Sequence, residues 1–195
     1  ASLSDGLTYT VHVVATDSAG NAETSSTYTF KYDTTAPTSA TTFPASNGSY
    51  NAAGWTAGCA SAGLCGTATD AETAVANVKV SIKRSSDNTY WNGSAWSGAS
   101  ENLLTATGTT SWSYGLAAAS LTDGVTYTVH AVATDNAGNT QTAATFTFKY
   151  DTTAPSSTTT FPAASGSYNA LGWAAGCAGA GLCGAAADGT SGVAN

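Results

Sequence analysis

The chain has 195 residues, only 9% of them charged, and its formal net charge is −7 at pH 7. Because a negative chain repels phosphate backbones and anionic lipid surfaces, we expect no nucleic-acid partner. No run reaches the roughly 18 to 20 consecutive apolar residues of a membrane-spanning helix, so we expect no membrane span.

Alternation of apolar and polar residues predicts the first strands. Residues 8–15 place Tyr9, Val11 and Val13 on one face. A turn-rich segment separates this run from a second one at 26–32, so the two predict a hairpin, and the pattern of 8–15 returns at 126–133. Residues 78–83 alternate in the same way and predict a further half-buried strand.

A second hairpin is predicted at 88–97, where Asn92-Gly93 lies between Trp91 and Trp96. The two indoles would then pair across the strands. Further strand material follows around Leu103 and at 112–116, and no ten-residue window has a helical period. About seven short strands with turns between them indicate an all-β chain that forms an antiparallel β-sandwich.

The sequence repeats itself with an offset of 118 residues. Residues 1–77 and 119–195 align without a gap and are identical at 55 of 77 positions. DTTAP, at 33–37 and 151–155, has the proline and small polar residues of a junction. We therefore expect the C-terminal part of a preceding repeat at 1–33, a complete repeat at 34–151, and the N-terminal part of a following repeat at 152–195.

Neither end segment has enough apolar surface to offset the entropy of ordering its own chain. We therefore expect further copies of the repeat to complete both ends, either along one polypeptide or between separate chains.

A tyrosine motif and the junction together point to a family. The motif occurs twice, as Leu3, Asp5-Gly6 and Tyr9 and as Leu121, Asp123-Gly124 and Tyr127. It resembles the tyrosine corner of fibronectin type III and immunoglobulin-like domains, in which the hydroxyl bonds to an upstream backbone group. With the ATDxAGN turn and DTTAP, the unit resembles the bacterial immunoglobulin-like repeats of large secreted and cell-surface proteins. The resemblance implies an Ig-like sandwich with Tyr9 and Tyr127 in structural roles.

The four cysteines form two close pairs, Cys59 with Cys65 and Cys177 with Cys183. The small residues between them permit a turn tight enough for a local disulfide in each pair. Other pairings, including ones between chains, and free thiols or a metal site remain open alternatives. Disulfides would place the protein in an oxidising compartment, extracellular or at the cell surface.

Oxygen donors near turns and junctions could converge on a cation: Asp17, Asn21, Asp33, Asp70, Asp135, Asn139, Asp151 and Asp188. By resemblance to calcium-dependent adhesins, Asp33 and Asp151 are the calcium candidates, and no other cofactor is expected. A calcium ion needs six to eight oxygens, however, and one aspartate per junction supplies few. The competing interpretation is that these aspartates shape turns by bonding nearby backbone amides.

Two functions compete. An extracellular structural repeat would form a stalk or filament by tandem or head-to-tail association. Alternatively, Trp91 and Trp96 could stack on sugar rings, which would make the chain a glycan-binding adhesin, unless the two indoles serve only the core. Enzymatic activity is not expected, because the sequence has no G-x-S-x-G turn and its glutamates are scattered.

Overall fold

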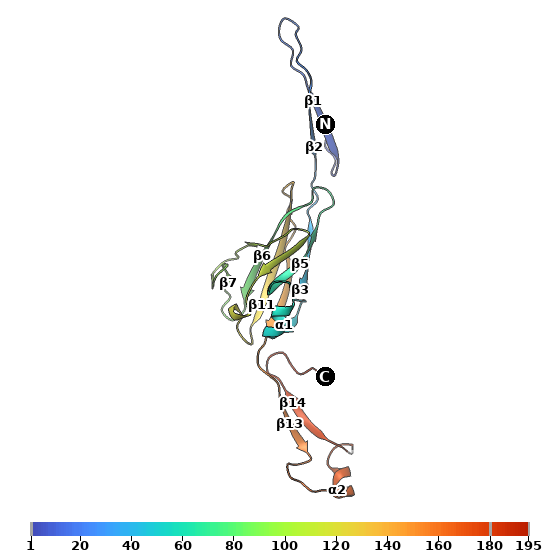
Figure 1. The fold of residues 1–195 in the computed structure, drawn as a ribbon, viewed down its shortest axis with the longest axis vertical. Helices are drawn as coiled ribbons and strands as arrows, with labels where there is room; N and C mark the ends of the chain where they lie inside the picture. The colour runs from blue at the N-terminus through green and yellow to red at the C-terminus, as the bar shows by residue number, and fades with distance from the viewer. Residues whose placement is uncertain (1, 180, 195) are drawn as a thin grey trace.

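The structure is a computed structural model that describes residues 2–179 and 181–194. Three parts follow one another along its long axis (Figure 1). An N-terminal hairpin lies at one end, a complete β-sandwich occupies the middle, and a smaller C-terminal module lies at the other end. Within the described residues, no helix has the length and apolar character needed to cross a membrane.

The central sandwich runs from β3 to β12 and has two sheets. Its smaller sheet has the order β10-β5-β3, with β3 at Thr38–Phe43, β5 at Gly63–Thr69 and β10 at Ser111–Gly115. The larger sheet has the order β4-β12-β11-β6-β7-β8, and β9 pairs with β6. Its strands are β4 (Gly48–Tyr50), β6 (Val75–Arg84), β7 (Tyr90–Trp91), β8 (Trp96–Gly98), β9 (Leu104–Thr105), β11 (Thr126–Asp135) and β12 (Ala144–Tyr150).

The core lies between the two sheets and follows the period-2 pattern of the strands. In β6, Val78, Val80 and Ile82 are fully buried, and in β11 every second residue from Tyr127 to Asp135 is buried. The sandwich is therefore held together mainly by apolar burial between strands that lie far apart in sequence.

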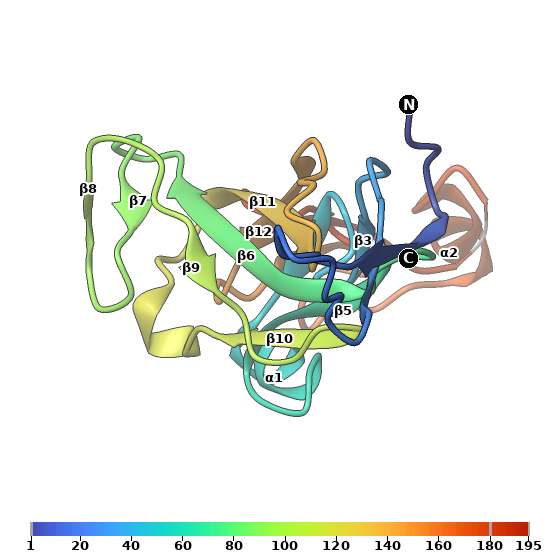
Figure 2. The same cartoon turned by 90° about the horizontal axis from the view of Figure 1, so that it is seen from above.

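The expected all-β sandwich is confirmed, with both predicted hairpins. β1 (Thr8–Val13) pairs antiparallel with β2 (Ser26–Lys31), as their copies β11 and β12 do, and β7 pairs with β8 so that Trp91 lies opposite Trp96. One short strand departs from the antiparallel pairing, because β4 runs parallel to β12. Seen along the long axis, the hairpin β7–β8 extends to one side of the sandwich (Figure 2).

The short helical segments of the central sandwich were not expected. In α1 (Ala52–Ala57), the side chain of Asn51 caps the first turn by accepting the N–H of Gly54. The helix places Trp55 in the core, where the indole is fully buried and stacks on Phe148 with ring centroids 4.6 Å apart. A 3-10 turn, η1, spans Ala118–Ser120. Six residues form fewer than two helical turns, which is too short for a helical period to be recognised.

The two end parts repeat pieces of the central sandwich. The N-terminal hairpin consists of β1 (Thr8–Val13) and β2 (Ser26–Lys31), the sequence copies of β11 and β12. The C-terminal module consists of β13 (Ser156–Phe161), α2 (Ala170–Ala175) and β14 (Cys183–Ala187), the copies of β3, α1 and β5. Each end part therefore contains strands from only one part of a sandwich.

Both tyrosine motifs have the bond that the resemblance implied. The hydroxyl of Tyr127 accepts the N–H of Thr122 at 2.7 Å, and the hydroxyl of Tyr9 accepts the N–H of Ser4 at 2.6 Å. Tyr127 is fully buried, whereas Tyr9 is half-buried, because no second sheet of the described residues covers its hairpin. Burial raises the pKa of Tyr127 above that of an exposed tyrosine.

Replacing Tyr127 with Phe leaves the N–H of Thr122 without its partner at the edge of the core. We expect a loss of about 1 to 2 kcal/mol in unfolding free energy, measured by urea denaturation. The matched control is Tyr9→Phe, which removes the same bond where no sandwich surrounds it and is expected to change the unfolding midpoint little. An equal effect of both substitutions would contradict this role for Tyr127.

Candidate functional site: the junctions between units

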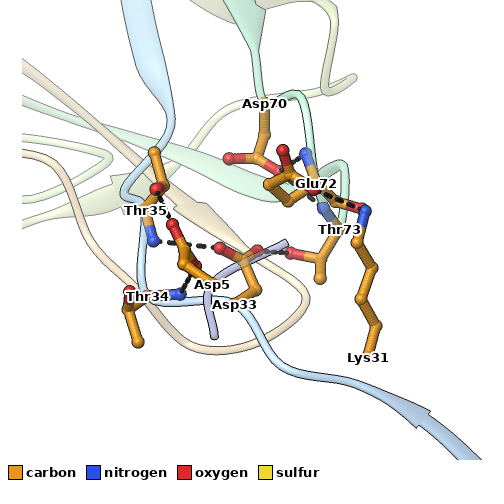
Figure 3. Close-up of polar contacts among 8 residues, drawn as sticks. All are labelled: Asp5, Lys31, Asp33, Thr34, Thr35, Asp70, Glu72 and Thr73. Atoms are coloured by element: carbon orange, nitrogen blue, oxygen red, sulfur yellow. Dashed lines mark hydrogen bonds and ion pairs between the residues drawn. The ribbon is translucent and has the colours of Figure 1, made fainter. Parts of the chain in front are cut away.

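The first junction is the segment 32–37 that joins the N-terminal hairpin to the central sandwich (Figure 3). The carboxylate of Asp5, in the turn before β1, binds two of its residues. One oxygen accepts the N–H of Thr34 and the other accepts the hydroxyl of Thr35, both at 2.6 Å. The side chain of Asp5 therefore fixes the direction in which the chain leaves the hairpin.

An ion pair links β2 of the hairpin directly to the central sandwich. The ammonium of Lys31 lies 2.6 Å from a carboxylate oxygen of Glu72 and donates to the backbone carbonyl of the same residue, also at 2.6 Å. Both side chains are partly exposed, so the electrostatic part of this contact is modest. It nevertheless fixes the hairpin against the loop that follows β5.

Asp33 ties the junction to two loops of the central sandwich. Its side chain accepts the N–H of Thr35 and the hydroxyl of Thr73, and it is only 7% exposed. Its backbone carbonyl accepts the side-chain amide of Asn139 at 3.1 Å, from the turn between β11 and β12. In that turn, the amide of Asn136 also donates to the carbonyl of Thr73. Residues from both ends of the repeat therefore meet at this junction.

The second junction, 150–155, repeats these contacts at the other end of the sandwich. Asp123 accepts the N–H of Thr152 at 2.6 Å and the hydroxyl of Thr153 at 2.7 Å. Asp151 accepts the N–H of Thr153, and the ammonium of Lys149 donates to the carbonyl of Thr190. The same side chains, 118 positions apart, thus hold both junctions, although Glu72 is replaced by Thr190.

Hydrogen bonds at these turns favour the charged form of the aspartates. The hydroxyl of Thr35 and then the N–H of Thr34 lower the pKa of Asp5, and the N–H of Thr152 and then the hydroxyl of Thr153 lower that of Asp123. Desolvation of Asp135 favours its neutral form, but the hydrogen bonds from Asn139, Gly138 and Ala137 together outweigh this, so its pKa is also lowered. Ionised carboxylates therefore hold the turns at neutral pH.

Three carboxylates converge beside the first junction. One oxygen each of Asp33, Asp70 and Asp135 lies within 4.8 Å of the other two. Asp135 is almost fully buried, and the Oδ2 atom of Asp70 is buried without a hydrogen-bond partner among the described residues. Three like charges at such distances repel unless a cation or a proton compensates them. An all-oxygen donor set with an unsatisfied oxygen fits a hard cation such as calcium.

The turn interpretation of the aspartates also holds. Asp17 and Asp135 each accept backbone N–H groups of their own turns, and Asp33 and Asp151 accept the N–H two residues further on. Of the calcium candidates, Asp33 joins the carboxylate cluster. Asp151 lies near Asp188 in the second junction, but within the described residues no third carboxylate joins them. Asp5 and Asp123 were not predicted as junction residues, although their recurrence next to a turn glycine was a usable signal.

Both local disulfides are present. Cys59 bonds Cys65, Cys177 bonds Cys183, and no described cysteine is free. Each bond connects the end of a short helix to the strand that follows it, β5 or β14. Of the pairings that the sequence left open, the structure therefore has the local ones.

The aromatic hairpin does not form an open stacking platform. Trp91 is only 7% exposed, and the planes of Trp91 and Trp96 are inclined at 56° to each other. The indole N–H of Trp91 is bound by the hydroxyl of Tyr114, and that of Trp96 by the carbonyl of Ser120. Because sugar rings stack on an exposed flat face, this geometry favours the core-packing interpretation of the two indoles over the glycan interpretation.

A serine, a glutamate and a histidine meet on the outer face of the large sheet. The hydroxyl of Ser81 donates to Oε1 of Glu101, and Nδ1 of His130 lies 2.6 Å from the same oxygen. The hydrogen bond from Ser81 and then the contact with His130 outweigh desolvation and lower the pKa of Glu101. The carboxylate lies between the other two groups, so the hydroxyl does not contact the imidazole as it does in a Ser-His-Asp triad. The cluster therefore anchors a loop to the sheet.

Because the pKa values of Asp5 and Asp123 are lowered, acid should weaken the hydrogen bonds of the junctions only at low pH. A carboxyl group whose pKa is lower in the folded than in the unfolded state stabilises the fold above its unfolded pKa. That contribution is lost as the pH falls through the folded value. We expect the amide signals of Thr34 and Thr152, followed by NMR, to titrate with midpoints below the ordinary aspartate value of 3.8.

The variant Asp5→Asn is the control, because it removes the carboxylate of the first junction and keeps that of the second junction in the same molecule. It should abolish the titration at Thr34 and leave that at Thr152 unchanged. Midpoints at or above the ordinary aspartate value would show that these carboxylates are not stabilised by the junction.

Comparison with known families agrees with this architecture. Residues 36–152 match a family model described as a bacterial Ig-like domain, and residues 1–41 match one described as a bacterial Ig-like domain of group 3. No curated protein matches the chain. Domains of this kind are generally structural rather than enzymatic, and the two disulfides agree with an extracellular or cell-surface setting. Because the first match covers more than half of its residues, the chain belongs to the bacterial Ig-like domain family.

Proposed function

We propose that the chain is an extracellular structural repeat that forms a stalk or filament by tandem or head-to-tail association of Ig-like units. The observation that carries the proposal is the recurrence of the junction contacts, because Asp5 and Asp123 hold equivalent threonines on either side of one sandwich. Units that are joined in the same way at both ends extend a chain with a regular rise. The extended arrangement of the three parts in Figure 1 supports the same function.

The junctions give such a stalk its stiffness. A short linker that is hydrogen-bonded to both neighbours has few free backbone angles, unlike a glycine- and serine-rich linker. The glycan-binding alternative has less support, because Trp91 and Trp96 use their faces and their N–H groups inside the unit.

Removing both junction carboxylates should make the chain flexible without unfolding the sandwich. For Asp5→Ala with Asp123→Ala, we expect small-angle X-ray scattering to report a broader range of particle dimensions than for the unchanged chain. The control is Asp87→Ala, which removes a carboxylate that binds Arg84 and Thr89 away from the junctions. A compact particle for the unchanged chain, or equal flexibility in the double variant and the control, would contradict the proposal.

We further propose that calcium binds the carboxylate cluster of Asp33, Asp70 and Asp135 and stiffens the first junction. Asp33 lies in the linker, Asp70 directly follows β5 and Asp135 is the last residue of β11, so a bound cation would connect three separate segments. The three aspartates supply part of the six to eight oxygens that calcium takes, and backbone carbonyls or water would supply the remainder.

Calcium should therefore raise the melting temperature of the chain by several degrees relative to EDTA, measured by calorimetry. Asp70→Asn should remove this shift, because it neutralises the carboxylate whose Oδ2 lacks a partner. Asp87→Asn makes the same chemical change at the surface and should preserve the shift. No heat of calcium binding in titration calorimetry, or an unchanged shift in Asp70→Asn, would overturn the assignment.

A further inference from the structure

The core of the central sandwich changes in character along its length. The half next to the second junction, here called the aromatic end, buries large side chains: Trp55, Leu64, Ile82, Tyr127, Phe148 and Tyr150. The half next to the first junction, here called the polar end, buries smaller apolar side chains: Ala68, Val75, Val78, Ala131 and Ala133. Small side chains remove less apolar surface from water, so packing stabilises the polar end less than the aromatic end.

The polar end also contains buried polar atoms that have no hydrogen-bond partner among the described residues: Ser39 Oγ, Thr41 Oγ1, Asp70 Oδ2, Asn77 Oδ1 and Gln141 Oε1. Ser39 and Thr41 lie in β3, the strand that begins after the first junction. Asp70 and Asn77 lie on either side of the loop between β5 and β6, and Gln141 lies in the loop after β11. Within the described part of the chain, all atoms of this kind are at the polar end.

These two features lower the free energy needed to open the polar end. A polar atom that is buried without a partner has lost its hydrogen bonds to water, and it regains them when the segment opens. The apolar surface exposed at the same time is small. Regions with few buried apolar contacts open separately from the rest of a protein. Each strand can meanwhile stay paired at the aromatic end.

The carboxylate cluster lies at the same end and links this opening to cations. Asp33, Asp70 and Asp135 belong to three segments, so their oxygens lie within 4.8 Å of one another only in the closed arrangement. Without a cation, repulsion between the three charges disfavours this arrangement. A ligand that binds only one of two states shifts the equilibrium toward that state.

We propose that the polar end of the sandwich opens locally while the aromatic end stays folded, and that calcium at the carboxylate cluster holds the polar end closed. The inference rests on the proposed calcium site and specifies what that site regulates. Opening separates Asp33 from Thr73 and Asn139, the partners that tie it to the sandwich. Calcium therefore changes the first junction from a loose to a fixed connection.

The test is native-state hydrogen exchange of the 195-residue chain, followed by NMR in EDTA. The amides of Ala68 and Ala106 report on the polar end, and those of Leu116 and Tyr150 report on the aromatic end. Each of the four residues is buried and donates to a backbone carbonyl at 2.9 to 3.1 Å. Ala68 and Ala106 should have protection factors at least about tenfold lower, which depend less on urea because local opening exposes little surface.

A substitution in the aromatic end tests whether the opening is local. Ile82→Val removes one methylene from that end and should speed exchange at Leu116 and Tyr150 by about threefold or more. Exchange at Ala68 and Ala106 should not change, because Ile82 stays buried when only the polar end opens.

A second substitution tests the cause of the opening. Thr41→Val replaces the unpartnered hydroxyl with a methyl group of similar size, so it should slow exchange at Ala68 and Ala106 by about fivefold or more. The matched control is Thr42→Val in the next residue, whose exposed hydroxyl donates to the carbonyl of Cys65. This control should not slow exchange at either amide.

The regulation by calcium is tested with the same amides. At a calcium concentration ten times the dissociation constant, exchange at Ala68 and Ala106 should slow by about tenfold, because the cation binds only the closed form. Asp70→Asn should abolish this effect, and Asp87→Asn, which makes the same change away from the junctions, should preserve it.

Equal protection and equal urea dependence of all four amides would overturn the local opening, and so would an Ile82→Val variant that speeds all of them. Calcium that binds in titration calorimetry without slowing exchange would overturn its closing role and leave the calcium site standing. An absence of calcium binding would refute both the site and the closing role. The measurements in EDTA would then still decide whether the polar end opens.

Discussion

The structure depends on one constraint: the apolar face of each small sheet must be covered by strands that come much later in the sequence. Trp55 follows β4 near the start of the repeat and stacks on Phe148 near its end. Neither partner is buried by its own neighbours in sequence, as the exposed copies Trp173 and Phe30 demonstrate. The free energy of the sandwich therefore comes from a non-local contact, and a unit cannot fold half by half.

The junctions also depend on contacts between residues that lie far apart in the sequence, but these contacts are polar. The first junction is held by Asp5 from the preceding hairpin and by Asn139 from the far end of the following unit. A unit must therefore be complete before it can fix the linker that precedes it. Most of these contacts pair one carboxylate with neutral N–H or hydroxyl donors. The junctions are therefore well defined although few residues of the chain are charged.

The sequence predicted what is local and periodic. Alternation located β1, β2, β6 and β11, the Asn92-Gly93 turn located the second hairpin, and spacing located the disulfides. It did not predict β3 and β5, because each has only one large apolar residue, Phe43 or Leu64, and so shows no apolar alternation, and it did not predict the helix α1. The carboxylate cluster was only partly predictable, because Asp33, Asp70 and Asp135 meet through the fold and not through any common motif.

The internal repeat shows which structural features depend on the local sequence and which depend on the surrounding structure. Val11 and Val129 occupy strands with the same hairpin register, so the local sequence is sufficient to give the same secondary structure twice. Yet one valine is exposed and the other is buried, which means that burial is not encoded in the strand itself. Strand pairing thus follows from the local sequence, whereas burial depends on the elements that lie over the strand.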